Sequence, residues 1–163
     1  MSESIRRVSL ERTSHGRLLA RNERGATMAV GMGEDSDFTP VELLLVAIAG
    51  CTAIDVDLIT GKRSAPEEFG VDASGVKIRD ERGIRMVDLG VDFRVRFPDT
   101  DAGRAAEAVL ERAITASHDR ICTVTRTVEV GSPVTASLRG TRVAGPPPAG
   151  EPESRPTPTP DPD

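Results

Sequence analysis

The N-terminal segment alternates polar and apolar residues in short runs. The runs at residues 6–10, 17–20 and 26–30 are separated by turn residues such as His15-Gly16 and Asn22 to Gly25. This alternation is typical of strands joined by tight turns, because successive side chains of a strand point to opposite faces. The pattern therefore predicts a three-stranded antiparallel meander.

A helix is predicted next, from about Pro40 to Lys62. Thr39 supplies an N-cap hydroxyl, Pro40 suits the first helical position, and Glu42 is placed to close a capping box. From Val41 to Ile59 nearly every position is apolar, so we expect the helix to be buried on most sides. One small sheet covers only one side of such a helix, so a second copy of the chain is expected to cover the other side, in a homodimer.

Two longer alternating segments follow, at residues 69–79 and 84–97, joined by a turn of hairpin length. Residues 99–117 have the apolar spacing of an amphipathic helix, and a last strand around 134–138 is expected to close a second sheet. The order of strands, helix, strands, helix and strand predicts an α+β fold in one domain, residues 1–139.

The composition changes from residue 140 onward. Residues 140–163 hold eight of the twelve prolines. Such a segment buries too little apolar surface to fold, so we interpret it as a disordered, solvated tail. A proline-rich docking peptide is the alternative, but no PxxP motif flanked by basic residues supports it.

Composition excludes several classes of partner. The chain has a formal net charge of -5 and no Trp or Tyr, a poor match for binding nucleic acid. The N-terminus lacks the apolar stretch of a secretory signal, and the longest apolar run, Leu43 to Ala49, is too short to span a bilayer. We therefore expect a cytoplasmic protein that binds neither nucleic acid nor membrane.

The only two cysteines are Cys51, about three turns into the predicted helix, and Cys122. In a reducing compartment, such cysteines are free thiols, transient redox partners or metal ligands more often than a structural disulfide. Cysteines in apolar runs are also commonly buried and inert. Asp55 lies one turn beyond Cys51 and would oppose thiolate formation if the two side chains face each other. Gly50 leaves room for a small substrate or for a packed helix.

The surroundings of Cys122 are more cationic. His118, Arg120 and Arg126 could favour a thiolate, and His118 is close enough in sequence to share a helical face with Cys122. A surface or capping role is the alternative for His118. No metal site is expected, because the two cysteines and two histidines show no familiar ligand spacing.

Three segments carry a resemblance to a known family. Thr39-Pro40-Val41-Glu42, Gly50-Cys51-Thr52 and the later Cys122-Thr123-Val124 resemble the OsmC family of osmotically inducible and organic hydroperoxide resistance proteins. The resemblance covers about residues 5–138 and implies an intertwined α+β homodimer, with two antiparallel sheets around long central helices. It also implies reduction of organic or lipid hydroperoxides, with Cys51 as the attacking cysteine and Cys122 as the resolving one. An external dithiol would reduce their disulfide, and no cofactor is implied.

The chain departs from this family where the peroxidases activate their attacking cysteine. Their activating glutamate directly follows the proline of the helix-start motif, and Val41 stands there. Glu42 is one residue later, rotated by about 100° around the helix, so we interpret it as the capping residue. The family's activating arginine has no clear counterpart in the loop 31–39. The candidate supporting residues are Glu42, Arg12, Arg17, Arg21 and Arg24, with His118 and Arg126 near Cys122.

Three functions are consistent with these observations. The first is a thiol-dependent peroxidase that uses a Cys51–Cys122 disulfide cycle. The second, favoured by the loss of the glutamate at Val41, is a non-catalytic stress or binding protein that keeps the fold and takes a small ligand. The third is a structural dimer with inert thiols. Reactivity of the thiols in the folded protein separates the third from the first two.

Overall fold

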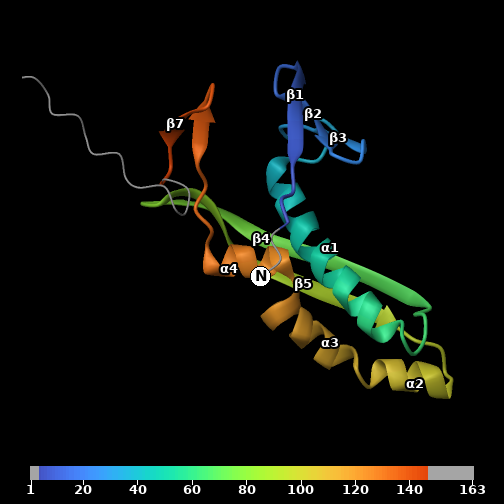
Figure 1. Cartoon of the computed structure of the whole chain (residues 1–163). Coiled ribbons are helices and arrows are strands. Elements are labelled where there is room, and N and C mark those ends of the chain that lie inside the picture. Colours follow the sequence, from blue (N-terminus) through green and yellow to red (C-terminus); the bar gives the residue numbers. More distant parts are fainter. Residues whose placement is uncertain (1–3, 147–163) are drawn as a thin grey trace, which may run out of the picture. The chain divides into compact units, whose positions relative to one another are not determined.

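The structure, a computed structural model, describes residues 4–146 (Figure 1). The chain divides after Arg126 into two compact units. The first unit contains the N-terminal strands, the long helix, the long hairpin and both cysteines. The second unit begins within a helix and contains the C-terminal hairpin. Both units combine helices with antiparallel strands, so the α+β class is confirmed.

The N-terminal sheet is the predicted meander. Strands β1 (Val8–Ser14), β2 (Arg17–Asn22) and β3 (Thr27–Val30) are antiparallel and lie in the order β1-β2-β3. Gly16 has a φ of 68°, which places the turn between β1 and β2 in the left-handed region that favours glycine. Val30 then pairs with Phe38 just before the long helix begins.

Helix α1 (Pro40–Thr60) forms where the sequence predicts it, with the predicted capping box. The Glu42 carboxylate accepts the Thr39 N–H at 2.7 Å, and the Thr39 hydroxyl oxygen accepts the Glu42 N–H at 3.3 Å. The helix ends slightly earlier than predicted, where the Gly61 N–H donates to the Asp57 carbonyl at 2.8 Å.

The long hairpin is also confirmed. Strands β4 (Glu68–Asp80) and β5 (Gly83–Arg96) pair antiparallel, with Val71 opposite Phe93. Gly83, at a φ of 100°, closes the turn between them. Helix α1 packs against this hairpin on one side and against the helices that follow it on another (Figure 1).

The predicted single helix over 99–117 is wrong in one respect, because it is broken. Helix α2 (Asp101–Glu107) is followed by α3 (Leu110–Ala116) and then by a π-helical turn, η1 (Ser117–Ile121). The break lies at Val109, a β-branched residue whose φ of -109° and ψ of -1° depart from regular helix.

The C-terminal elements differ from the prediction. Helix α4 (Thr123–Val130) is followed by β6 (Ala136–Leu138), which pairs with β7 (Thr141–Ala144) in a sheet of its own instead of closing the second sheet. Strand β7 also lies within the predicted tail, so the boundary at 140 is corrected. Residues 147–163 of that predicted tail lie outside the described residues.

The two sides of α1 differ in exposure. Ile48, Thr52, Val56 and Thr60 are buried against the rest of the chain. On the other side, Val46, Ile54 and Leu58 are 50%, 62% and 63% exposed. The expectation that α1 is buried on most sides is therefore not met within one chain. By length and composition alone α1 would also suit a membrane, which corrects the argument that its apolar run is too short.

Candidate functional site

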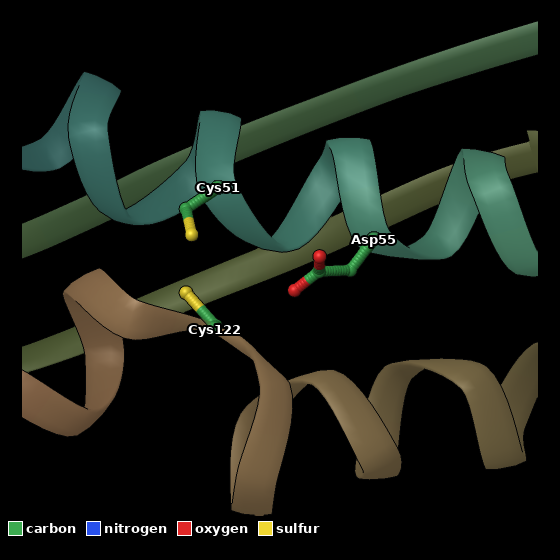
Figure 2. A group of neighbouring side chains, drawn as sticks. All are labelled: Cys51, Asp55 and Cys122. Atoms are coloured by element: carbon green, nitrogen blue, oxygen red, sulfur yellow. The ribbon is translucent and has the colours of Figure 1, made fainter. Parts of the chain in front are cut away.

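Two segments far apart in the sequence bring the cysteines together. Cys51 and Asp55 lie one turn apart on α1, and Cys122 lies between η1 and α4. Their sulfur and carboxylate atoms lie within 4.8 Å of one another. Figure 2 shows the three side chains converging on a common point. We call Cys51, Asp55 and Cys122 the dithiol cluster.

The π-helical turn sets the position of Cys122. Its backbone N–H donates to the Ser117 carbonyl, five residues earlier, at 2.9 Å. Cys122 then acts as the N-cap of α4, because its sulfur accepts the Thr125 N–H at 3.4 Å and its carbonyl accepts the Arg126 N–H at 3.1 Å. The sequence predicts a loop or the first turn of a new element here, and the second alternative is confirmed.

Residues on α1 complete the environment of Cys122. The Thr52 hydroxyl donates to the Cys122 sulfur at 3.5 Å and also lies 3.1 Å from the Ile48 carbonyl. Cys122 is fully buried in the described chain, whereas Cys51 is partly exposed. A reagent in solvent therefore reaches Cys51 more easily than Cys122.

The pKa of Cys51 is raised above its ordinary value. Burial is the largest cause, and the hydrogen bond to Cys122 and the negative charges of Cys122 and Asp55 add to it. The Val124 N–H acts in the opposite direction without reversing the shift. The expectation that Asp55 opposes thiolate formation at Cys51 is confirmed.

The pKa of Cys122 moves the other way. Burial alone would raise it, but hydrogen bonds from Thr125, from the Thr52 hydroxyl and from the Cys51 S–H lower the pKa to about 7. Hydrogen bonds from the uncharged donors Thr125, Thr52 and Cys51 thus lower the pKa of Cys122. The buried Cys122 thiol therefore ionises at a lower pH than the accessible Cys51 thiol.

The Asp55 carboxylate is held in place from across the helix interface. The Ser117 hydroxyl donates to it at 2.8 Å, and Ser117 is fully buried. Because Ser117 also accepts the Cys122 N–H, one turn of chain positions both Asp55 and Cys122.

The other candidates lie elsewhere or serve other roles. Glu42 is exposed, and hydrogen bonds from Thr39 lower its pKa, so the capping role is confirmed. Arg17 pairs with Asp35 at 2.8 Å on the N-terminal side of α1. Arg12 lies in β1 and is exposed.

The candidates near Cys122 have local partners. His118 is exposed, and its Nδ1 lies 3.0 Å from the Asp119 carboxylate. Arg126 belongs to the first turns of α4, where its backbone N–H bonds to Cys122. Sequence reasoning did not identify Thr52, Ser117 or Thr125. Only Thr125 carried a local signal, since it stands three residues after an N-cap position.

Comparisons with known proteins identify the family of this chain. The family model described as OsmC-like protein matches residues 33–137. An uncharacterised protein of Mycobacterium tuberculosis is 31% identical over 128 residues, which cover 77% of this chain and 90% of that protein.

Solved structures share the fold. A hypothetical protein of Aquifex aeolicus matches with a TM-score of 0.63 at 22% identity, over 80% of this chain and 91% of that one. A Legionella pneumophila protein, described as the organic hydroperoxide resistance protein OsmC and a predicted redox protein, matches with a TM-score of 0.53 at 13% identity. That match covers 78% of this chain and 91% of the Legionella chain.

Proposed function

Because this chain belongs to the OsmC-like protein family, we propose that it is a thiol-dependent peroxidase that reduces organic or lipid hydroperoxides through Cys51 and Cys122. The observation that carries the proposal is the close approach of an accessible thiol to a buried, low-pKa thiol in one cluster. A relative described as an organic hydroperoxide resistance protein shares the fold. The hydroperoxide substrate is assigned to this chain from its family membership.

In this chain Cys122 acts as the base, because Val41 stands where the family's peroxidases have their activating glutamate. The Cys51 S–H donates to the Cys122 sulfur, so a proton can pass directly from Cys51 to Cys122. The resulting Cys51 thiolate attacks the terminal oxygen of the hydroperoxide, forming an S–O bond while the O–O bond breaks. The departing alkoxide takes the proton from Cys122 and leaves as an alcohol, with Cys51 as the sulfenic acid.

The same proton transfer prepares the second step. Cys122, now a thiolate again, attacks the sulfur of the Cys51 sulfenic acid and releases hydroxide as the disulfide forms. An external dithiol, available in the cytoplasm, then reduces the disulfide by thiol–disulfide exchange. Cys51 is the attacker in this scheme because it is the accessible thiol.

A non-catalytic binding function is the second candidate. The raised pKa of Cys51 and the presence of Val41 at the family's glutamate position favour it. Under this alternative Cys51 stays protonated, and the site holds a small apolar or thiol-reactive ligand.

We propose a homodimer as the working form. Val46, Gly50, Ile54 and Leu58 recur at four-residue steps along the exposed side of α1, and we call them the open stripe. A side-chain carbon added to Gly50 would meet nothing within 4 Å in the described chain, so a second helix can approach closely there. A second copy of the chain covers this stripe.

A bilayer is the other cover that would suit the open stripe. Asp55 and Asp57 lie on the same helix, and each would cost about 2.5–3.5 kcal/mol at the centre of a membrane-spanning helix. Asp55 is also bonded to the buried Ser117. We therefore favour protein over lipid as the cover.

One equivalent of cumene hydroperoxide, added to the reduced protein, tests the peroxidase. We expect mass spectrometry to show a Cys51–Cys122 disulfide within seconds in the native protein and none in Cys51→Ser. Two titratable thiols after that interval would reject the peroxidase and favour the binding function.

A further inference from the structure

The dithiol cluster also brings together three side chains of the types that bind metal ions. The four-residue spacing of Cys51 and Asp55 puts both on one face of α1, but sequence spacing does not reveal the third member, because Cys122 comes from another element. Once folded, two sulfurs and one carboxylate oxygen lie within 4.8 Å of one another. Thiolates select soft or borderline cations such as Zn²⁺ over Mg²⁺ or Ca²⁺.

Small side-chain rotations would bring the three ligand atoms to the separations of a tetrahedral ion. Bonds of about 2.3 Å to sulfur and about 2.1 Å to oxygen place tetrahedral ligand atoms roughly 3.5–3.8 Å apart. The present limit of 4.8 Å exceeds this by ~1 Å, a shift within reach of side-chain torsions. Figure 2 shows the two sulfurs facing each other and the carboxylate directed toward them.

The ligands have the outer partners that metal sites use. Ser117 donates to the Asp55 carboxylate at 2.8 Å. The Thr125 N–H and the Thr52 hydroxyl donate to the Cys122 sulfur at 3.4 Å and 3.5 Å. Such outer hydrogen bonds fix ligand orientation and raise metal affinity.

Charge favours a cation at the same point. With both sulfurs deprotonated the cluster carries three negative charges, which repel one another at these short separations. A divalent ion between them reverses that repulsion and releases the Cys51 proton. Cys51 is partly exposed, which leaves a path for the ion and for a water as the fourth ligand.

We infer that Cys51, Asp55 and Cys122 together bind one soft divalent cation of the Zn²⁺ class, with water in the fourth position. The bound ion occupies the sulfur lone pairs that would attack a hydroperoxide. Metal binding and oxidation therefore exclude each other at this site, and the metal shields the reduced thiols.

A calorimetric titration of the reduced full-length protein with Zn²⁺ tests the inference. Co²⁺ serves as a second probe, because thiolate coordination produces sulfur-to-cobalt charge-transfer absorption. We expect one ion per chain. Cys51→Ser and Cys122→Ser should each lower the affinity at least ~100-fold, and Asp55→Asn and Ser117→Ala about 10–100-fold.

Asp57→Asn is the matched control, since Asp57 is an exposed carboxylate on the same helix. Its affinity should equal that of the unmodified protein. No binding, or an affinity unchanged in either cysteine variant or in Asp55→Asn, would overturn the inference. The titration contains no hydroperoxide, so its outcome does not depend on whether the proposed peroxidase activity exists.

Discussion

Helix α1 has two apolar sides, one buried within the chain and one exposed. One side packs Ile48, Thr52 and Val56 against the chain and carries the dithiol cluster at its edge. The other side, the open stripe, is equally apolar and more than half exposed at Ile54 and Leu58. A helix that is apolar all round therefore serves two purposes: one side builds the chemistry, and the other requires a second surface.

The largest effect is expected from removing the proposed base, Cys122, on the packed side of α1. Cys122→Ser replaces the thiolate that accepts the Cys51 proton with a neutral hydroxyl, so the first oxidation at neutral pH should slow by about 10²–10⁴-fold, the range for loss of a positioned general base. Stopped-flow kinetics with excess cumene hydroperoxide measures this. An unchanged rate would mean that Cys122 only resolves and takes no part in the first step.

A larger side chain at Gly50, in the open stripe, tests whether a second copy of the chain packs there. A Cβ at position 50 meets nothing within 4 Å in the described residues, so Gly50→Leu should enlarge the outer face and weaken dimerisation by about 1–3 kcal/mol per protomer through overpacking. Sedimentation velocity measures the dissociation. Ala105→Leu, a similar enlargement at an exposed site on α2, should leave association intact. A native protein that sediments as a monomer throughout would refute the dimer.

The smallest expected effect concerns the pKa of Cys122. Its lowered pKa means that the thiolate fraction, and with it the oxidation rate, rises as pH increases through about 7 and levels off above. Thr52→Val deletes one donor to the thiolate. This loss of about 1.5–3 kcal/mol should move the midpoint upward by about 1–2 pH units.

Thr60→Val is the matched control for that profile. Thr60 is likewise buried on α1, and its hydroxyl donates to the Val56 carbonyl at 2.9 Å. It should alter stability without moving the midpoint. Equal shifts in the two variants would mean that general loosening of α1, and not the hydrogen bond, sets the pKa.

Local patterns predicted the elements that local forces determine. The capping box at Thr39 and Glu42 and the alternation of the two hairpin strands required only neighbouring residues. Both cysteines were identified in the same way, from their segments. The disposition of Asp55 depended on whether two side chains on one helix face each other, which sequence leaves open.

The remaining features depend on contacts between distant segments. A π-helical turn at Ser117–Ile121 shifts every later side chain around the axis relative to an α-helix, so the spacing from His118 to Cys122 was misleading. Contacts from Thr52 to Cys122 and from Ser117 to Asp55 join residues separated by 70 and 62 positions. No periodicity in the sequence encodes such pairs.

The central claim is that Cys51, although protonated at rest, receives the first oxygen while Cys122 holds the charge. The most direct measurement treats Cys122→Ser and Cys51→Ser in parallel with one equivalent of cumene hydroperoxide and dimedone, and locates the sulfenic acid adduct by peptide mass spectrometry. We expect the adduct to accumulate on Cys51 in the first variant, slowly because its base is missing, and almost none to form on Cys122 in the second. Equal or faster labelling of Cys122 would contradict the account.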